Sequence, residues 1–110
     1  MVGFRYVSLV TEADLTADSF APHEGTTFTL LTEDGTAPLV LTEVVRELGV
    51  AQAAPAAREP FSLWFTSPTD VALPQGTYAM DHEGLGRLDL FLVPRQPAPG
   101  GPPRYEAMFS

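Results

Sequence analysis

The sequence predicts an all-β protein: a small antiparallel barrel or sandwich of about six or seven strands, with one short helix near the N-terminus. Segments of alternating apolar and polar residues recur along the chain. Glycine and proline residues separate them at spacings that suit hairpin turns. With 110 residues, 45% of them hydrophobic, the chain is long enough for one domain with a single core.

Residues 1–10 are predicted to form an N-terminal strand that precedes a single β domain of residues 11–110. Four apolar residues of this strand are expected on one face: Val2, Phe4, Tyr6 and Val10. The opposite face is also largely apolar. Apolar residues on both faces are typical of a strand that is covered on both sides, or of a strand that pairs with something outside its own domain.

A short helix is predicted after this strand. Thr11 and Asp14 have the spacing of a capping box, and helical structure is expected to continue to about Ser19. Pro22 is expected to end it, because proline cannot continue a helix. Phe20 is the expected core residue of this segment.

Six strands are predicted in the rest of the chain, at residues 26–31, 39–48, 61–65, 77–82, 87–93 and 105–109. Asp34-Gly35 predicts a hairpin turn between the first two. Residues 42–48 also fit a helix, but their β-branched residues favour a strand. Glu83–Gly86 predicts a second tight turn. Pro94 is expected to end the strand of residues 87–93. Residues 49–60 are expected to form a surface loop.

Composition excludes several classes of function. The chain has no cysteine, so disulfides, thiolate zinc sites and cysteine nucleophiles are excluded. The net charge is −8 and the six basic residues are scattered, which argues against nucleic acids as partners. No apolar run approaches the roughly 20 residues of a transmembrane helix, and no signal peptide is recognised. The compartment stays open: cytoplasmic, or exported as part of an assembly.

No residue pattern predicts an enzyme, a cofactor or a metal site. His82 lies at a strand end, where a histidine hydrogen-bonded to the backbone is the favoured interpretation, and His23 is the only other imidazole. For Asp89 or Asp81, an ion pair with Arg87 or a cross-strand arginine is favoured over a role as catalytic carboxylates. No G-x-S-x-G motif marks a nucleophilic serine.

Trp64 is the aromatic residue expected on the outside. Alternation places Phe61, Leu63 and Phe65 inward, so Trp64 faces outward, where a large aromatic side chain is a candidate contact residue. The other aromatic residues are expected to fill the core.

The order of several segments resembles an uncharacterised bacterial family of about this length that carries a domain-of-unknown-function label. These segments are REPFSLWF, LPQGTY, the turn from His82 to Gly86, LFLVP and YEAMF. The resemblance covers roughly residues 15–110. It implies no activity, cofactor or site residue; some members look associated with phage-tail-like collar proteins, which implies assembly rather than chemistry.

The sequence therefore predicts a non-catalytic structural module that assembles with itself, as a homo-oligomer or filament, or with another protein. The N-terminal strand is expected to add to a neighbouring sheet, and Trp64 is a second candidate contact. The alternative is a small barrel that binds an apolar ligand in an aromatic interior lined by Phe28, Tyr78 and Phe91.

Overall fold

The structure is a computed structural model, and it describes residues 15–46, 60–69 and 72–109. The predicted strand at residues 1–10 and the N-cap at Thr11 lie outside these ranges. The described elements are α1 (Ala17–Phe20), the 3₁₀ turn η2 (Ala21–His23), β1 (Thr27–Thr32), β2 (Gly35–Arg46), β3 (Phe61–Thr66), β4 (Gly76–His82), β5 (Gly86–Arg95) and β6 (Arg104–Phe109). No described helix has the length and apolar character needed to cross a membrane.

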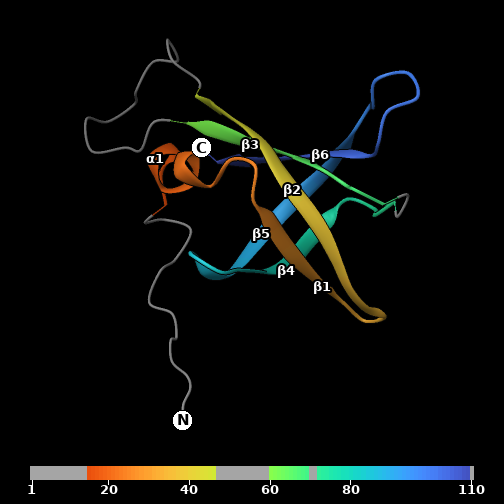
Figure 1. Cartoon of the computed structure of the whole chain (residues 1–110), viewed down its shortest axis with the longest axis horizontal. Coiled ribbons are helices and arrows are strands. Elements are labelled where there is room, and N and C mark those ends of the chain that lie inside the picture. The colour runs from red at the N-terminus through yellow and green to blue at the C-terminus, as the bar shows by residue number, and fades with distance from the viewer. Residues whose placement is uncertain (1–14, 47–59, 70–71, 110) are drawn as a thin grey trace.

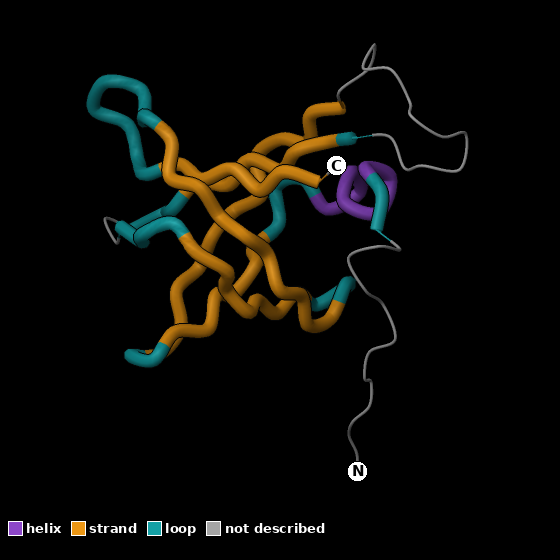
Figure 2. The backbone as a smooth tube through the Cα atoms, turned by 180° about the vertical axis from the view of Figure 1, so that it is seen from behind, coloured by secondary structure: helices purple, strands orange, loops and turns teal. Residues whose placement is uncertain are grey.

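The six described strands close into one antiparallel barrel, in the order β1-β2-β3-β6-β5-β4 and back to β1 (Figure 1). The prediction of an all-β fold with a short N-terminal helix is confirmed, and the barrel is the correct member of the predicted pair. One end of the barrel carries α1, η2 and the β4–β5 turn, and we call it the helix end. The other, the loop end, carries the β1–β2 turn and the β3–β4 and β5–β6 loops (Figures 1 and 2).

The strands of the barrel are not joined equally. The β1–β2, β2–β3 and β3–β6 ladders each contain six residue pairs, and the β4–β5 hairpin contains seven. The β1–β4 and β5–β6 ladders contain only three pairs each. The barrel is therefore a four-stranded sheet to which the β4–β5 hairpin is attached by two short seams.

A β-bulge in β2 keeps its apolar residues inside. Leu41 pairs with Phe65 and Glu43 with Trp64, so Thr42 is the extra residue. Its hydroxyl donates to the Trp64 carbonyl at 3.1 Å. The extra residue shifts the alternation by one position, so that Leu41 and then Val44 both face the core. The helical alternative for the start of residues 42–48 is wrong, since β2 continues to Arg46.

The barrel interior is packed with aliphatic and aromatic side chains, including Leu88, Leu90 and Leu92 of β5. Phe20 is fully buried and confirms its expected role as a core residue. Its ring centroid lies 5.7 Å from that of Phe109 and 6.5 Å from that of Phe28. The helical segment thus closes the helix end with an aromatic cluster.

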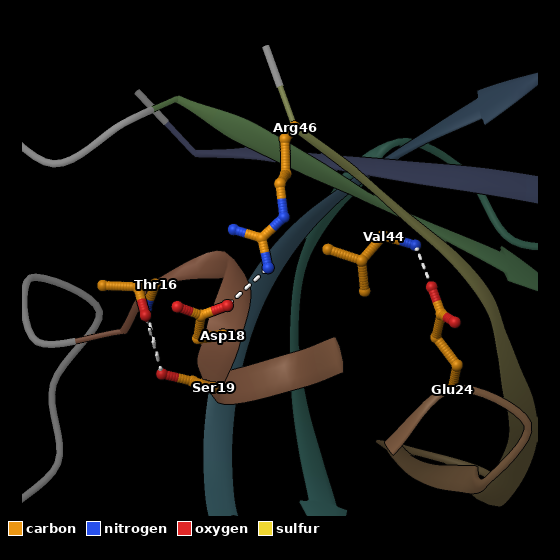
Figure 3. Close-up of polar contacts among 6 residues, drawn as sticks. All are labelled: Thr16, Asp18, Ser19, Glu24, Val44 and Arg46. Atoms are coloured by element: carbon orange, nitrogen blue, oxygen red, sulfur yellow. Dashed lines mark hydrogen bonds and ion pairs between the residues drawn. The ribbon is translucent and has the colours of Figure 1, made fainter. Parts of the chain in front are cut away.

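Polar contacts fasten this helical cap to β2 (Figure 3). Arg46 forms an ion pair with Asp18 of α1. The Glu24 carboxylate accepts a hydrogen bond at 2.8 Å from the backbone N–H of Val44, next to the bulge. The N-terminus of the described helix is capped at Thr16, whose backbone N–H donates to Ser19 Oγ at 3.0 Å.

The two prolines expected to end an element have different outcomes: α1 ends at Phe20, before Pro22, as expected, whereas Pro94 lies inside its strand. Pro22 occupies the start of η2, where a proline lacks only an N–H that has no helical partner. Pro94 is in β5, which continues to Arg95. Proline is tolerated there because residues 93–95 pair with β6 but have no pairing partner on β4.

Candidate interaction surface

Trp64 faces outward, as the alternation of β3 predicted. It pairs with Glu43 of β2 on one side and with Glu106 of β6 on the other, which places these side chains on the outer face. Trp64 is half-buried because the Arg104 guanidinium lies 4.6 Å from its ring centroid. This cation–π contact leaves part of the indole accessible.

The outer face beside Trp64 contains a buried carboxylate. The Glu106 side chain is only 11% exposed, and it accepts a hydrogen bond from Arg95 Nε at 2.8 Å. Arg95 and Arg104 are themselves opposite each other in the β5–β6 ladder. The ion pair with Arg95 therefore compensates the charge of Glu106 at its nearly buried position.

Two large apolar side chains remain exposed nearby. Phe91 of β5 is 49% exposed and Met108 of β6 is 69% exposed. Each lies two residues from the Val93–Glu106 pair, on the helix-end side, and therefore on the same outer face as that pair. Neither side chain is needed to complete the interior, so these residues are the strongest candidates for contact with another molecule.

The open part of the β5–β6 seam lies between these two residues. Val93–Glu106 is the last pair of this ladder toward the helix end. From that pair β5 and β6 diverge, as Figure 1 shows on the side of α1. Among the described residues, β5 from Gly86 to Leu92 is thus paired on the β4 side alone.

A shallow pocket of about 290 Å³ lies at the loop end, between the β3–β4 and β5–β6 loops. It is lined by Ala72, Leu73, Pro94, Arg95, Pro97, Gly101, Pro103, Arg104 and Tyr105. The Tyr105 hydroxyl accepts a hydrogen bond from the Leu73 N–H at 2.8 Å, which ties the β3–β4 loop to β6. The volume is at the lower limit for a small-molecule site, and the lining suits one apolar side chain.

His82 is engaged through both ring nitrogens at the helix end. Its Nδ1 accepts hydrogen bonds from the backbone N–H groups of Gly84 at 2.9 Å and Leu85 at 3.2 Å. Its Nε2 lies 2.9 Å from Thr26 Oγ1, which donates to the His23 carbonyl at 2.6 Å. This arrangement requires an unprotonated Nδ1 and a proton on Nε2. The predicted backbone-bonded histidine at a strand end is confirmed.

The surroundings of His82 oppose its protonation. Burial lowers the pKa of His82, the nearby His23 lowers it further, and Glu83 raises it to a smaller extent. These three residues are part of the lining of an open pocket of about 410 Å³. The full lining is His23, Thr26, Thr27, His82, Glu83 and Gly84. The described residues contain no group of three or more metal-ligating side chains. His82 thus joins the β4–β5 turn to Thr26 through hydrogen bonds at both ring nitrogens.

The remaining predicted residues have different outcomes. Val2, Phe4, Tyr6 and Val10 lie outside the described residues. Asp81 pairs with Arg87 at 2.6 Å, as predicted. The residues proposed to line an interior ligand site do not share a cavity, since Phe28 is fully buried and Phe91 lies outside. Sequence reasoning missed Met108, although the alternation of Tyr105 and Phe109 already placed it outward.

The fold and these surfaces define a class: a closed six-stranded antiparallel barrel with a helical cap at one end and an incompletely paired outer seam. The chain belongs to the family described as Domain of unknown function (DUF6916), whose model matches residues 15–109. This confirms the family resemblance inferred from the sequence. No curated protein and no solved structure matches the chain.

Proposed function

We propose that this protein is a non-catalytic assembly module that binds a protein subunit, most simply a second copy of itself. The observation that carries the proposal is the pair of large apolar side chains, Phe91 and Met108, exposed on the outside of a barrel whose interior is already filled. When a partner covers exposed apolar side chains of this size, their burial stabilises the complex.

Residues 1–10 supply the binding strand in this proposal. Nine of these ten residues are uncharged, and both faces of the predicted strand are largely apolar. An extended segment of this kind binds to the edge of another sheet through backbone hydrogen bonds.

The polar groups of the described barrel favour this function over catalysis. His82 uses both ring nitrogens in structural hydrogen bonds, and the Glu106 carboxylate is held by Arg95. No buried side-chain nitrogen or oxygen among the described residues lacks a hydrogen-bond partner. A general base needs a lone pair directed into a cleft, whereas the lone pair of His82 Nδ1 already accepts hydrogen bonds from backbone N–H groups.

The test compares the native mass of the full-length protein with that of residues 11–110, by sedimentation velocity over a range of concentrations. We expect a dimer or larger species for the full-length protein and a folded monomer for residues 11–110. The same assembly state for both proteins would contradict strand donation. A monomeric full-length protein at every concentration would contradict self-assembly altogether.

A further inference from the structure

We infer that the free edge of β5 at the open β5–β6 seam is the site that accepts the N-terminal strand, residues 1–10, of a second copy. This inference rests on the proposed function and specifies where the strand binds. It is carried by the direction of the β5 backbone groups, by the side chains that flank the seam and by charge complementarity.

The hydrogen-bonding direction of β5 follows from its pairing. His82 and Gly86 pair across the three-residue turn of the β4–β5 hairpin, so even-numbered residues of β5 direct their N–H and C=O groups toward β4. Odd-numbered residues direct theirs the other way, toward β6. Pro94 fits this assignment, because as an even-numbered residue it requires no N–H toward β6.

The odd-numbered residues of β5 that lie between Val93 and the helix end therefore direct their backbone N–H and C=O groups into the open seam. These residues are Arg87, Asp89 and Phe91, and all three are exposed. No described strand pairs with them on that side. A row of donors and acceptors at alternate positions is what an added strand requires.

The seam also matches the strand in length and in polarity. Residues Gly86–Leu92 of β5 span about 23 Å at roughly 3.3 Å per residue, which fewer than ten extended residues cover. On the outer face, Phe91 and Met108 flank the seam. An added strand places every second side chain on the outer face, beside Phe91 and Met108. Its remaining side chains point to the inner face, where Leu88 and Leu90 are buried. An acceptor of this kind selects a strand that is apolar on both faces.

Charge favours the same occupant. Residues 1–10 contain Arg5 and no acidic residue, a charge of +1, so residues 11–110 carry −9, which is −8 less +1. Asp89 lies in the middle of the free edge. Its carboxylate makes no hydrogen bond or ion pair with the described part of the chain, and it interacts electrostatically with the neighbouring Arg87. A cationic strand beside Asp89 is stabilised electrostatically, whereas an acidic strand is repelled there.

The position at which the described chain begins supports donation of the N-terminal strand to this edge. The described chain begins at Leu15, just before α1, and α1 lies at the helix end together with the C-terminal end of β6 (Figure 1). The seam opens toward that same end. Two copies that meet at their helix ends can exchange N-terminal strands reciprocally, which closes the assembly as a dimer.

The test adds a synthetic peptide of residues 1–10 to the protein of residues 11–110 and follows backbone amide exchange by NMR. We expect at least tenfold slower exchange for the amides of Asp89 and Phe91, while the even-numbered Leu88 and Leu90 amides, already bonded to β4, change little. This alternation is specific to strand addition at one edge. Protection confined to another strand, or no protection, would overturn the inference.

Charge reversal supplies a matched pair of variants. Asp89→Arg should weaken peptide binding about tenfold or more, and Asp34→Arg, the same change in the exposed β1–β2 turn, should leave it unchanged. Both positions are exposed, so both variants are expected to fold. Equal affinity in the two variants would contradict the inference. If the full-length protein assembles through residues 1–10 while β5 stays unprotected, the proposed function stands and this site is wrong.

Discussion

The barrel interior and the outer face of β5 and β6 both hold large apolar side chains, but only those in the interior are buried. On β5 alone, Leu90 and Leu92 are buried while Phe91, between them, is half exposed. Hydrophobic burial explains the inner residues, because their transfer from water stabilises the folded state. It does not explain Phe91 or Met108. The difference separates residues that the fold requires from residues that, in the proposed function, a partner covers.

The largest expected effect comes from truncating a phenylalanine in each region. Phe20→Ala should destabilise the protein by about 3–5 kcal/mol, because it leaves a cavity among Phe28, Phe61 and Phe109. Phe91→Ala makes the same chemical change at an exposed site and should cost less than about 1 kcal/mol. Chemical denaturation of residues 11–110 measures both. Similar losses for the two variants would remove the distinction between the regions.

The next largest expected effect is the loss of stability when either of two ion pairs of β5 is broken. Arg95→Met should destabilise the protein by about 1–3 kcal/mol, because it leaves the nearly buried Glu106 carboxylate without its guanidinium. Arg87→Met breaks the pair with the half-exposed Asp81 and should cost less than about 1 kcal/mol. Denaturation midpoints at neutral pH check the order. A larger loss for Arg87→Met would show that burial of the carboxylate is not what decides the cost.

The smallest effect is a pH dependence at the helix end. Because the folded-state pKa of His82 is lowered, the unfolded chain takes up a proton at about pH 6.5 while the folded protein resists it. Stability should therefore be highest above about pH 6.5 and should fall as the pH drops below that value. The slope of unfolding free energy against pH measures this. His82→Gln should flatten the slope; an unchanged slope would show that His82 is not its source.

Much of the fold could be predicted because its signals are local. The Asp34-Gly35 turn, the alternation of Leu88, Leu90 and Leu92, and the apolar Phe20 each depend on neighbouring residues only. The choice between barrel and sandwich could not be predicted. Closure depends on the β1–β4 and β5–β6 pairings, which join strands through only three residue pairs each. Local sequence patterns do not specify such short ladders, and β1 and β4 are also far apart in the sequence.

The candidate surface was predictable to a smaller degree. Alternation placed Trp64 outward correctly, but Phe91, which was assigned to the core or to an interior ligand site, lies on the outer face. Which outer residues stay exposed depends on their neighbours across the sheet: Arg104 covers part of Trp64, whereas no described strand pairs with β5 beside Phe91. Such neighbours are known only once the strand order is known.

The most direct test of strand donation compares amide exchange at the free β5 edge in two proteins, without added peptide. In the assembled full-length protein the amides of Asp89 and Phe91 should exchange at least tenfold more slowly than in residues 11–110, because a strand from a second copy bonds to them. Equal exchange rates at both positions in the two proteins, in samples where only the full-length protein assembles, would contradict the assignment of this edge.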